Sequence, residues 1–169
     1  MSFRITDINT LKLPKTHFYS VKVEENEFSE FREYYNRCKL NDRKRREFAE
    51  IASFLTLIGS TDGALPDYFK NEDSADRILA PHYVENEDDE PLPDNYGLRL
   101  YCYRESNEVV VLFGGDRKTV PGAVINCPNC YPHFQKANYF SEILDLAFEE
   151  ITIWVEEHFI IRPEGIELN

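Results

Sequence analysis

Three residues in the second half of the chain are of types that bind metal ions. Cys127, Cys130 and His133 form a C-x-x-C-x-x-H pattern, and thiolate and imidazole groups are ligands that zinc prefers. A structural zinc site needs four ligands, so a distant residue such as His82 or Cys102 would have to supply the fourth. Zinc binding is therefore one interpretation of this motif.

The two cysteines of this motif have two further interpretations. In thioredoxin-like proteins a C-x-x-C pair is a redox centre, with a strand before the motif and a helix that starts at it, but Pro132 is expected to interrupt such a helix. The other interpretation is a Pro-rich turn that holds reduced thiols, because four cysteines in ordinary segments do not suggest a disulfide framework. We expect this last arrangement, with no metal and no cofactor.

Two basic clusters are candidates for binding anions. Residues 114–119 (GGDRKT) contain Gly and Lys, but they do not meet the spacing G-x-x-x-x-G-K-[ST] of a phosphate-binding loop, and we expect a turn that ends a strand. Residues 43–46 (RKRR) lie in a predicted helix, where such a run is usually a solvated face. Arg43, Arg45 and Arg46 are our candidates for contact with RNA or with an acidic partner.

The strands that position these groups follow from hydrophobic alternation. Residues 16–23 alternate between two faces and predict a half-buried strand, and residues 5–13 predict an additional strand or an extended arm. Residues 97–105 and 108–113 are β-rich and are joined by two residues, which predicts a hairpin. The second strand of this hairpin is apolar on both faces, as a central strand is.

Two helices are predicted between these strands. Asn26 is the expected N-cap of a helix that ends near Lys39, because its side chain can accept hydrogen bonds from the first turn. A second helix is expected to start at Asn41 or Asp42 and to end at Gly59. Their short connection predicts an antiparallel pair.

These elements predict an α+β fold with a small antiparallel sheet, an N-terminal helix pair and a long C-terminal helix. The last helix is expected over residues 138–158, with a strand in its second half as the lesser alternative, because a β-branched run lies there. Residues 1–169 are expected to form a single domain. Residues 60–96 are predicted to be an acidic insertion or a long surface loop, with a possible short strand near residues 77–80.

Charge and hydropathy narrow the classes of function. The net charge is −12, with −8 in residues 71–94 and −7 in residues 141–169, so the remaining residues sum to +3. This acidity argues against general attraction to nucleic acid or to an anionic membrane, because phosphate binding depends on clustered Lys and Arg. We find no apolar run of the ~20 residues that span a bilayer and no apolar signal-peptide core, and therefore expect a cytoplasmic protein with no membrane partner.

A strand, two helices and a hairpin that ends in a Gly-rich, Lys-containing turn form an order that resembles the RelE/ParE superfamily of toxins from bacterial toxin–antitoxin systems. The segment GLRLYCYRESNEVVVLFGGDRKT, residues 97–119, is similar to the motif of that superfamily. The resemblance implies a small antiparallel sheet with helices packed on one face. It further implies an endoribonuclease of messenger RNA at the ribosome for the RelE branch, or action on DNA gyrase for the ParE branch.

The resemblance also implies roles for individual residues. Arg99 falls at the strand arginine of the family and Lys118 near its post-strand lysine, so both would stabilise charge on the scissile phosphate. Tyr101 would stack on a base or transfer a proton. Arg104 and Arg117 are further cationic candidates for binding.

The resemblance implies a protein partner of the antitoxin type, lying across the sheet edge or the helix pair. RNA is a less favoured partner because the chain is acidic. A catalytically inactive relative that acts through its partner is compatible with the same pattern. The alternative function is a non-enzymatic module that binds a protein or peptide.

Overall fold

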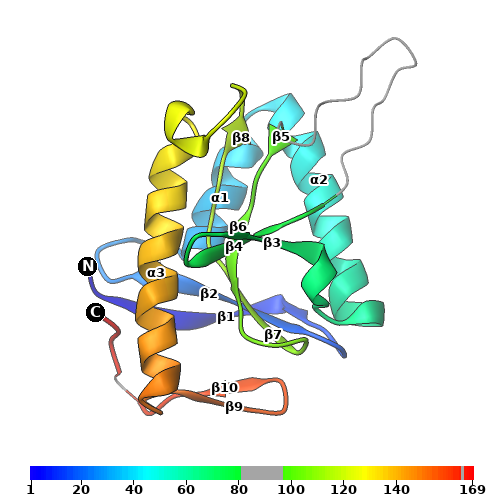
Figure 1. The fold of residues 1–169 in the computed structure, drawn as a ribbon. Helices are drawn as coiled ribbons and strands as arrows, with labels where there is room; N and C mark the ends of the chain where they lie inside the picture. The colour runs from blue at the N-terminus through cyan, green and yellow to red at the C-terminus, as the bar shows by residue number, and fades with distance from the viewer. Residues whose placement is uncertain (81–96, 165) are drawn as a thin grey trace.

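The computed structural model describes residues 1–80, 97–164 and 166–169. Within them, strands from both halves of the chain form a mixed central sheet (Figure 1). In spatial order its strands are β1 (Phe3–Lys12), β2 (His17–Val23), β7 (Val109–Leu112), β6 (Tyr101–Arg104), β4 (Ala75–Ile78) and β3 (Phe69–Glu72). The α+β class is confirmed. The expected antiparallel sheet is wrong, because β2 and β7 run parallel, and the long crossover that parallel neighbours need contains the helix pair.

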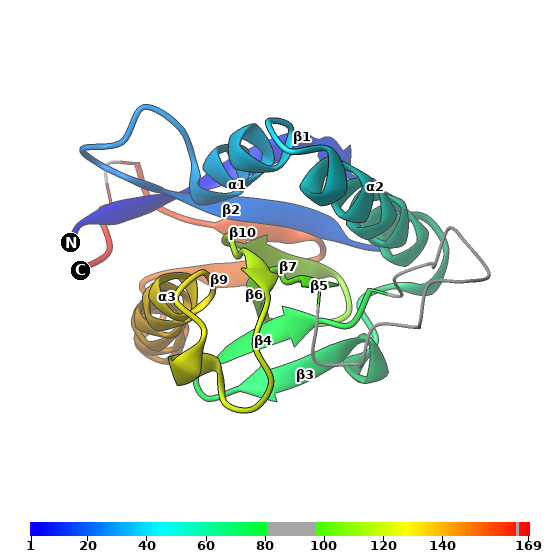
Figure 2. The same cartoon turned by 90° about the horizontal axis from the view of Figure 1, so that it is seen from above.

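Helices cover both faces of this sheet. They are α1 (Glu30–Cys38), α2 (Asp42–Leu57) and α3 (Tyr131–Glu149). Figure 2 shows α1 and α2 on one side of the sheet and α3 on the other. Asn41 caps α2 as predicted, because its side chain accepts a hydrogen bond from the N–H of Lys44. The cap of α1 is Ser29 rather than Asn26, which lies in the turn that follows β2.

Two apolar clusters fill the space between the sheet and the helices, one on each face. On one face, Val110 and Leu112 of β7 pack with Leu55 of α2. On the other face, Val109 and Val111 pack with α3. Strand β7 is therefore buried on both faces, as predicted, and it contributes side chains to both apolar clusters.

The ends of the chain differ from the expected order. The β1–β2 pair precedes the helices, so the predicted N-terminal helix pair is wrong. The predicted C-terminal helix is also wrong in its position, because α3 ends at Glu149 and a hairpin of β9 (Trp154–Glu156) and β10 (Phe159–Ile161) follows it. Ile151, the first residue of the β-branched run, adopts a left-handed φ of 57°, which an α-helix does not contain. The lesser alternative, a strand in the second half of residues 138–158, agrees with β9.

The hairpin near residue 100 is present as predicted. Strands β6 and β7 are antiparallel and pair Cys102 with Leu112. Beyond Gly114 and Gly115, the two segments that form the hairpin pair again as β5 (Gly97–Leu98) and β8 (Arg117–Lys118). A Cβ atom on Gly115 would lie 1.9 Å from the carbonyl oxygen of Arg99, so the chains approach each other at a distance that only glycine permits.

The stretch predicted as an insertion or surface loop, residues 60–96, contributes β3 and β4 to one edge of the central sheet. Its remaining part at residues 81–96 lies outside the described residues. Short helical turns complete the described structure at η1 (Ile58–Asp62), η2 (Pro66–Tyr68) and η3 (Val124–Asn126). In the described part of the chain, no helix combines the length and apolarity needed to cross a membrane.

Candidate functional site

Arg99, Tyr101 and Lys118, the residues assigned to catalysis by the resemblance, are brought together inside the protein. Their exposed fractions are 6%, 0% and 1%. The ring of Tyr101 packs against Phe134 of α3, with 6.1 Å between ring centroids. The ammonium group of Lys118 donates a hydrogen bond to the carbonyl oxygen of Gly122. The first turn of α3 therefore covers Tyr101, and the loop before α3 covers Lys118.

A third buried cation, Arg77 of β4, joins Arg99 and Lys118 in this cluster. Burial, and then the neighbouring Arg99, lowers the pKa of Arg77, and the same two causes lower the pKa of Lys118. Glu72 of β3 partly compensates, because its carboxylate lies 2.9 Å from Nε of Arg77. Arg77 and Glu72 were not among the predicted site residues, because no local pattern indicates that strands at the sheet edge will bring them to the hairpin.

The other cationic candidates of the hairpin bind groups of the same chain. Arg117 lies 3.1 Å from the carboxylate of Glu47, and both side chains are almost fully buried. Arg104 donates hydrogen bonds to the carbonyl oxygen of Ala64 and to the side chain of Asn107, at 2.7 and 2.6 Å. Neither of them joins Arg99 in an open cleft.

The Gly-rich turn is held by side chains of α1 and α2. Arg37 of α1 donates a hydrogen bond of 3.0 Å to the carbonyl oxygen of Gly115. Lys44 of α2 lies 2.7 Å from the carboxylate of Asp116. His133 of α3 is close enough to Arg37 and Asp116 for its titration to depend on them. These contacts fix the turn against the helix pair, and they describe a structural role for its charges.

His133 makes the stability of this region depend on pH. Burial, followed by the charge of Arg37, lowers the pKa of His133 from 6.5 to about 4. The unfolded chain binds more protons in this window, so the free energy of unfolding falls as the pH drops from about 6.5 towards 4. We expect the imidazole to contribute a loss of about 2 kcal/mol.

The His133→Gln variant separates this effect from the other titrating groups. Asp76 and Glu105 have pKa values raised mainly by burial, so their protonation at low pH acts in the opposite direction. Urea unfolding of both proteins at neutral and at mildly acidic pH isolates the imidazole, because the carboxylates are common to both. Equal losses of stability in wild type and variant would contradict the assignment.

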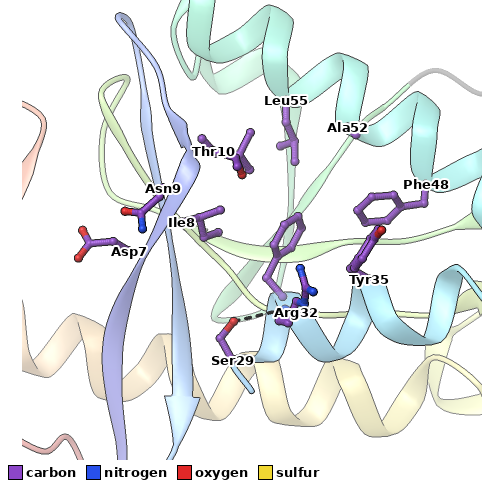
Figure 3. A pocket seen from close by; sticks show the side chains of 12 residues that line it. Asp7, Ile8, Asn9, Thr10, Ser29, Arg32, Tyr35, Phe48, Ala52 and Leu55 are labelled. Carbon is purple, nitrogen blue, oxygen red and sulfur yellow. Dashed lines mark hydrogen bonds between the residues drawn. The ribbon is translucent and has the colours of Figure 1, made fainter. Parts of the chain in front are cut away.

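A pocket of about 440 Å³ opens between β1 and the two helices α1 and α2 (Figure 3). We call it the helix-pair groove. Its apolar lining consists of Ile8, Leu11, Phe31, Phe48, Ala52 and Leu55. The β1–β2 ladder shifts register between Asp7 and Lys12, so the part of β1 that lines the groove departs from regular pairing.

Aromatic and basic side chains flank this groove. Tyr35 packs on Phe48 with 5.4 Å between ring centroids, and its ring also lies beneath the charged groups of Arg32 and Lys39, at 5.2 and 5.4 Å. These cation–π contacts hold positive charge beside the apolar lining. The side chain of Tyr35 is 36% exposed, so this flank is accessible to a partner.

The basic run at the start of α2 adds to this charge. Residues 32–46 contain seven Lys and Arg against two acids. Arg43, Arg45 and Arg46 are exposed. Arg45 precedes Phe48 by three residues and so lies on the groove side of α2, whereas Arg43 and Arg46 face away from Phe48. The three candidates therefore remain at the surface, and they extend a basic region from the groove over α2.

The C-x-x-C-x-x-H motif separates in the structure. Cys127 and Cys130 are buried before α3, whereas His133 is on the side of α3 that approaches Arg37. Cys102 lies in the core beneath the helix pair, and His82 is outside the described residues. Among the residues that the structure describes, no group of three or more His, Cys, Asp or Glu side chains is arranged to hold a metal ion.

Comparisons of the chain with protein-family models, with curated proteins and with solved structures find no match.

Proposed function

We propose that this protein is a RelE/ParE-like domain that acts by binding a protein partner in the helix-pair groove. The partner segment is an amphipathic helix, because such a helix can place its apolar face in a hydrophobic groove. Acidic side chains on its flanks would meet Arg32, Lys39 and Arg45. The observation that carries the proposal is an apolar groove with a basic flank on a chain whose net charge is −12.

The order of elements supports the family part of the proposal. Strand β2 is followed by α1 and α2, and the later hairpin β6–β7 ends in the Gly-rich turn that precedes Lys118. Helices α1 and α2 pack together on one face of the sheet (Figure 2). The resemblance implies both features, but it also implies an antiparallel sheet with helices on one face, whereas β2 and β7 are parallel and α3 covers the other face.

The environment of the hairpin cations supports partner binding over RNA cleavage. A ribonuclease needs a base, an acid and cations that reach the phosphate at the same time. Tyr101 and Lys118 are fully buried, and Arg117 is paired with Glu47. Their charges and hydrogen bonds stabilise the fold, and a non-enzymatic binding module with the same groove is the alternative function.

A designed peptide tests the groove directly. The probe is a helical peptide with Leu at positions i, i+3, i+4 and i+7 and Glu on its flanks, and its matched control carries Lys in place of every Glu. We expect the Glu peptide to bind at least about tenfold more tightly than the Lys peptide, because the flank is basic. Fluorescence anisotropy measures both affinities.

Two variants locate the binding. Ala52→Arg fills the groove and is expected to abolish binding of the Glu peptide, and Arg32→Glu is expected to weaken it. Lys70→Glu, at an exposed position of β3 on the opposite edge of the sheet, makes the same change of charge as Arg32→Glu and should leave binding unchanged. Equal binding of the two peptides, or cleavage of ribosome-bound messenger RNA by the purified protein, would refute the proposal.

A further inference from the structure

The two cysteines that precede α3 form a close pair. The N–H of Cys130 donates a hydrogen bond of 3.1 Å to the carbonyl oxygen of Cys127, which closes a turn of four residues and brings the two Cα atoms within disulfide range. The two side chains are close enough for each to affect the pKa of the other. Both cysteines are free thiols in this structure.

Helix α3 starts directly after this pair. Cys130 is the N-cap, and Pro132 occupies the first turn, where proline is tolerated because its missing N–H would have no partner within the helix. The expectation that Pro132 interrupts a helix at the motif is therefore wrong. The pair lies at the positive end of a helix of 19 residues, which favours a thiolate over a thiol.

The surroundings of the two sulfur atoms differ. Burial raises the pKa of Cys127, but hydrogen bonds from Thr119 and Cys130 outweigh it, and the net effect is a lowered pKa. The ammonium group of Lys118 adds a favourable charge interaction with Cys127. Burial, followed by the charge of Cys127, raises the pKa of Cys130 to about 12. Cys127 is therefore suited to be the attacking thiolate, and Cys130 is suited to be the resolving thiol that completes a disulfide.

The pair lies just beneath the surface. Both cysteine residues are fully buried, but their neighbours Asn126, Pro128 and Asn129 are exposed. A small local opening of this turn would admit a molecule of the size of hydrogen peroxide, whereas a folded protein could not reach the sulfur atoms. The geometry therefore favours a small oxidant.

We propose that Cys127 and Cys130 are a redox-active pair that a hydroperoxide oxidises to an intramolecular disulfide. The thiolate of Cys127 attacks one peroxide oxygen, the O–O bond breaks, and the leaving oxygen takes a proton to become water or an alcohol. The sulfur of Cys130 then attacks the resulting sulfenic acid, the S–O bond breaks, and water leaves with the thiol proton. Two electrons pass from the two sulfur atoms to the peroxide.

The disulfide would change the Gly-rich turn. In the reduced protein, the thiol of Cys130 donates a hydrogen bond of 3.2 Å to the carbonyl oxygen of Asp116. Oxidation removes this donor and also the negative charge beside Lys118. The redox state of the pair is therefore coupled to the turn that α1 and α2 hold.

Thiol counting and mass spectrometry test the pair in the full chain. Hydrogen peroxide is expected to lower the four free thiols of the protein to two, with a disulfide in the peptide that contains residues 127–130 and a mass lower by two hydrogen atoms. Cys38 and Cys102 are built-in controls, because each is buried with a raised pKa, and they should react at least about tenfold more slowly.

Two variants complete the test. Cys127→Ser should abolish the loss of two thiols. Thr119→Val keeps all four cysteines but removes a hydrogen-bond donor to Cys127, so it should slow oxidation at neutral pH and shift the pH profile of the rate upward. Equal reactivity of all four cysteines, a single oxidised cysteine without a disulfide, or an unchanged rate and pH profile in Thr119→Val would overturn the proposal.

Discussion

A Gly115→Ala substitution is expected to lower the free energy of unfolding by about 3 kcal/mol or more. The added methyl carbon would lie 1.9 Å from the carbonyl oxygen of Arg99 and 2.8 Å from its carbonyl carbon. These are backbone atoms of the paired chain, so no side-chain rotation relieves the clash. The paired chains beyond the β6–β7 hairpin would have to separate, and the contacts of the turn with the helices would weaken with them.

Gly114→Ala is the matched control for this prediction. The nearest atom to its added carbon would be Nη2 of Arg37 at 3.6 Å, an ordinary van der Waals contact. We expect its free energy of unfolding to stay within about 1 kcal/mol of wild type. Urea denaturation of both variants measures the difference, and similar stabilities would show that the close approach at Gly115 is not what fixes this glycine.

An Arg117→Met substitution is expected to cost about 3 kcal/mol of stability. It leaves the carboxylate of Glu47, whose side chain is 9% exposed, without its cationic partner in a site that water reaches poorly. Methionine fills most of the space of the arginine stem, so the loss reports the uncompensated charge rather than a cavity.

A double-mutant cycle separates the effect of the uncompensated charge from the effect of altered packing. Adding Glu47→Leu to Arg117→Met removes the buried charge and should restore the free energy of unfolding to within about 1 kcal/mol of wild type. Chemical denaturation of the four proteins gives the coupling energy. A double variant as unstable as Arg117→Met alone would show that packing, and not the ion pair, sets the cost.

Local pattern predicted several elements of this fold. Strict alternation and apolar residues on both faces predicted the strand at β2 and the buried strand β7, and Asn41 was recognisable as a cap because its side chain serves the adjacent turn. The parallel pairing of β2 with β7 was not predictable in this way. It joins residues about ninety positions apart, and no local spacing encodes it.

For the candidate sites too, local pattern predicted some features, whereas others depend on segments that are remote in the sequence. The basic run at Arg43, Arg45 and Arg46 was predicted to be a solvated helix face, and these residues are exposed. The burial of Tyr101 and Lys118 depends on α3 and its preceding loop, which pack over the hairpin from a remote part of the chain. The helix-pair groove is lined by β1, α1 and α2 together, and neither this arrangement nor the register shift in β1 could be predicted from residue types.

The most direct test of partner binding is a residue-by-residue NMR map of the protein on addition of the Glu-flanked peptide. We predict that amide signals change along α1, along α2 and in the part of β1 that lines the groove, and that the signals of Arg99, Tyr101 and Lys118 stay in place. Changes centred on these last three residues, or no changes at all at peptide concentrations well above micromolar, would contradict the proposed function.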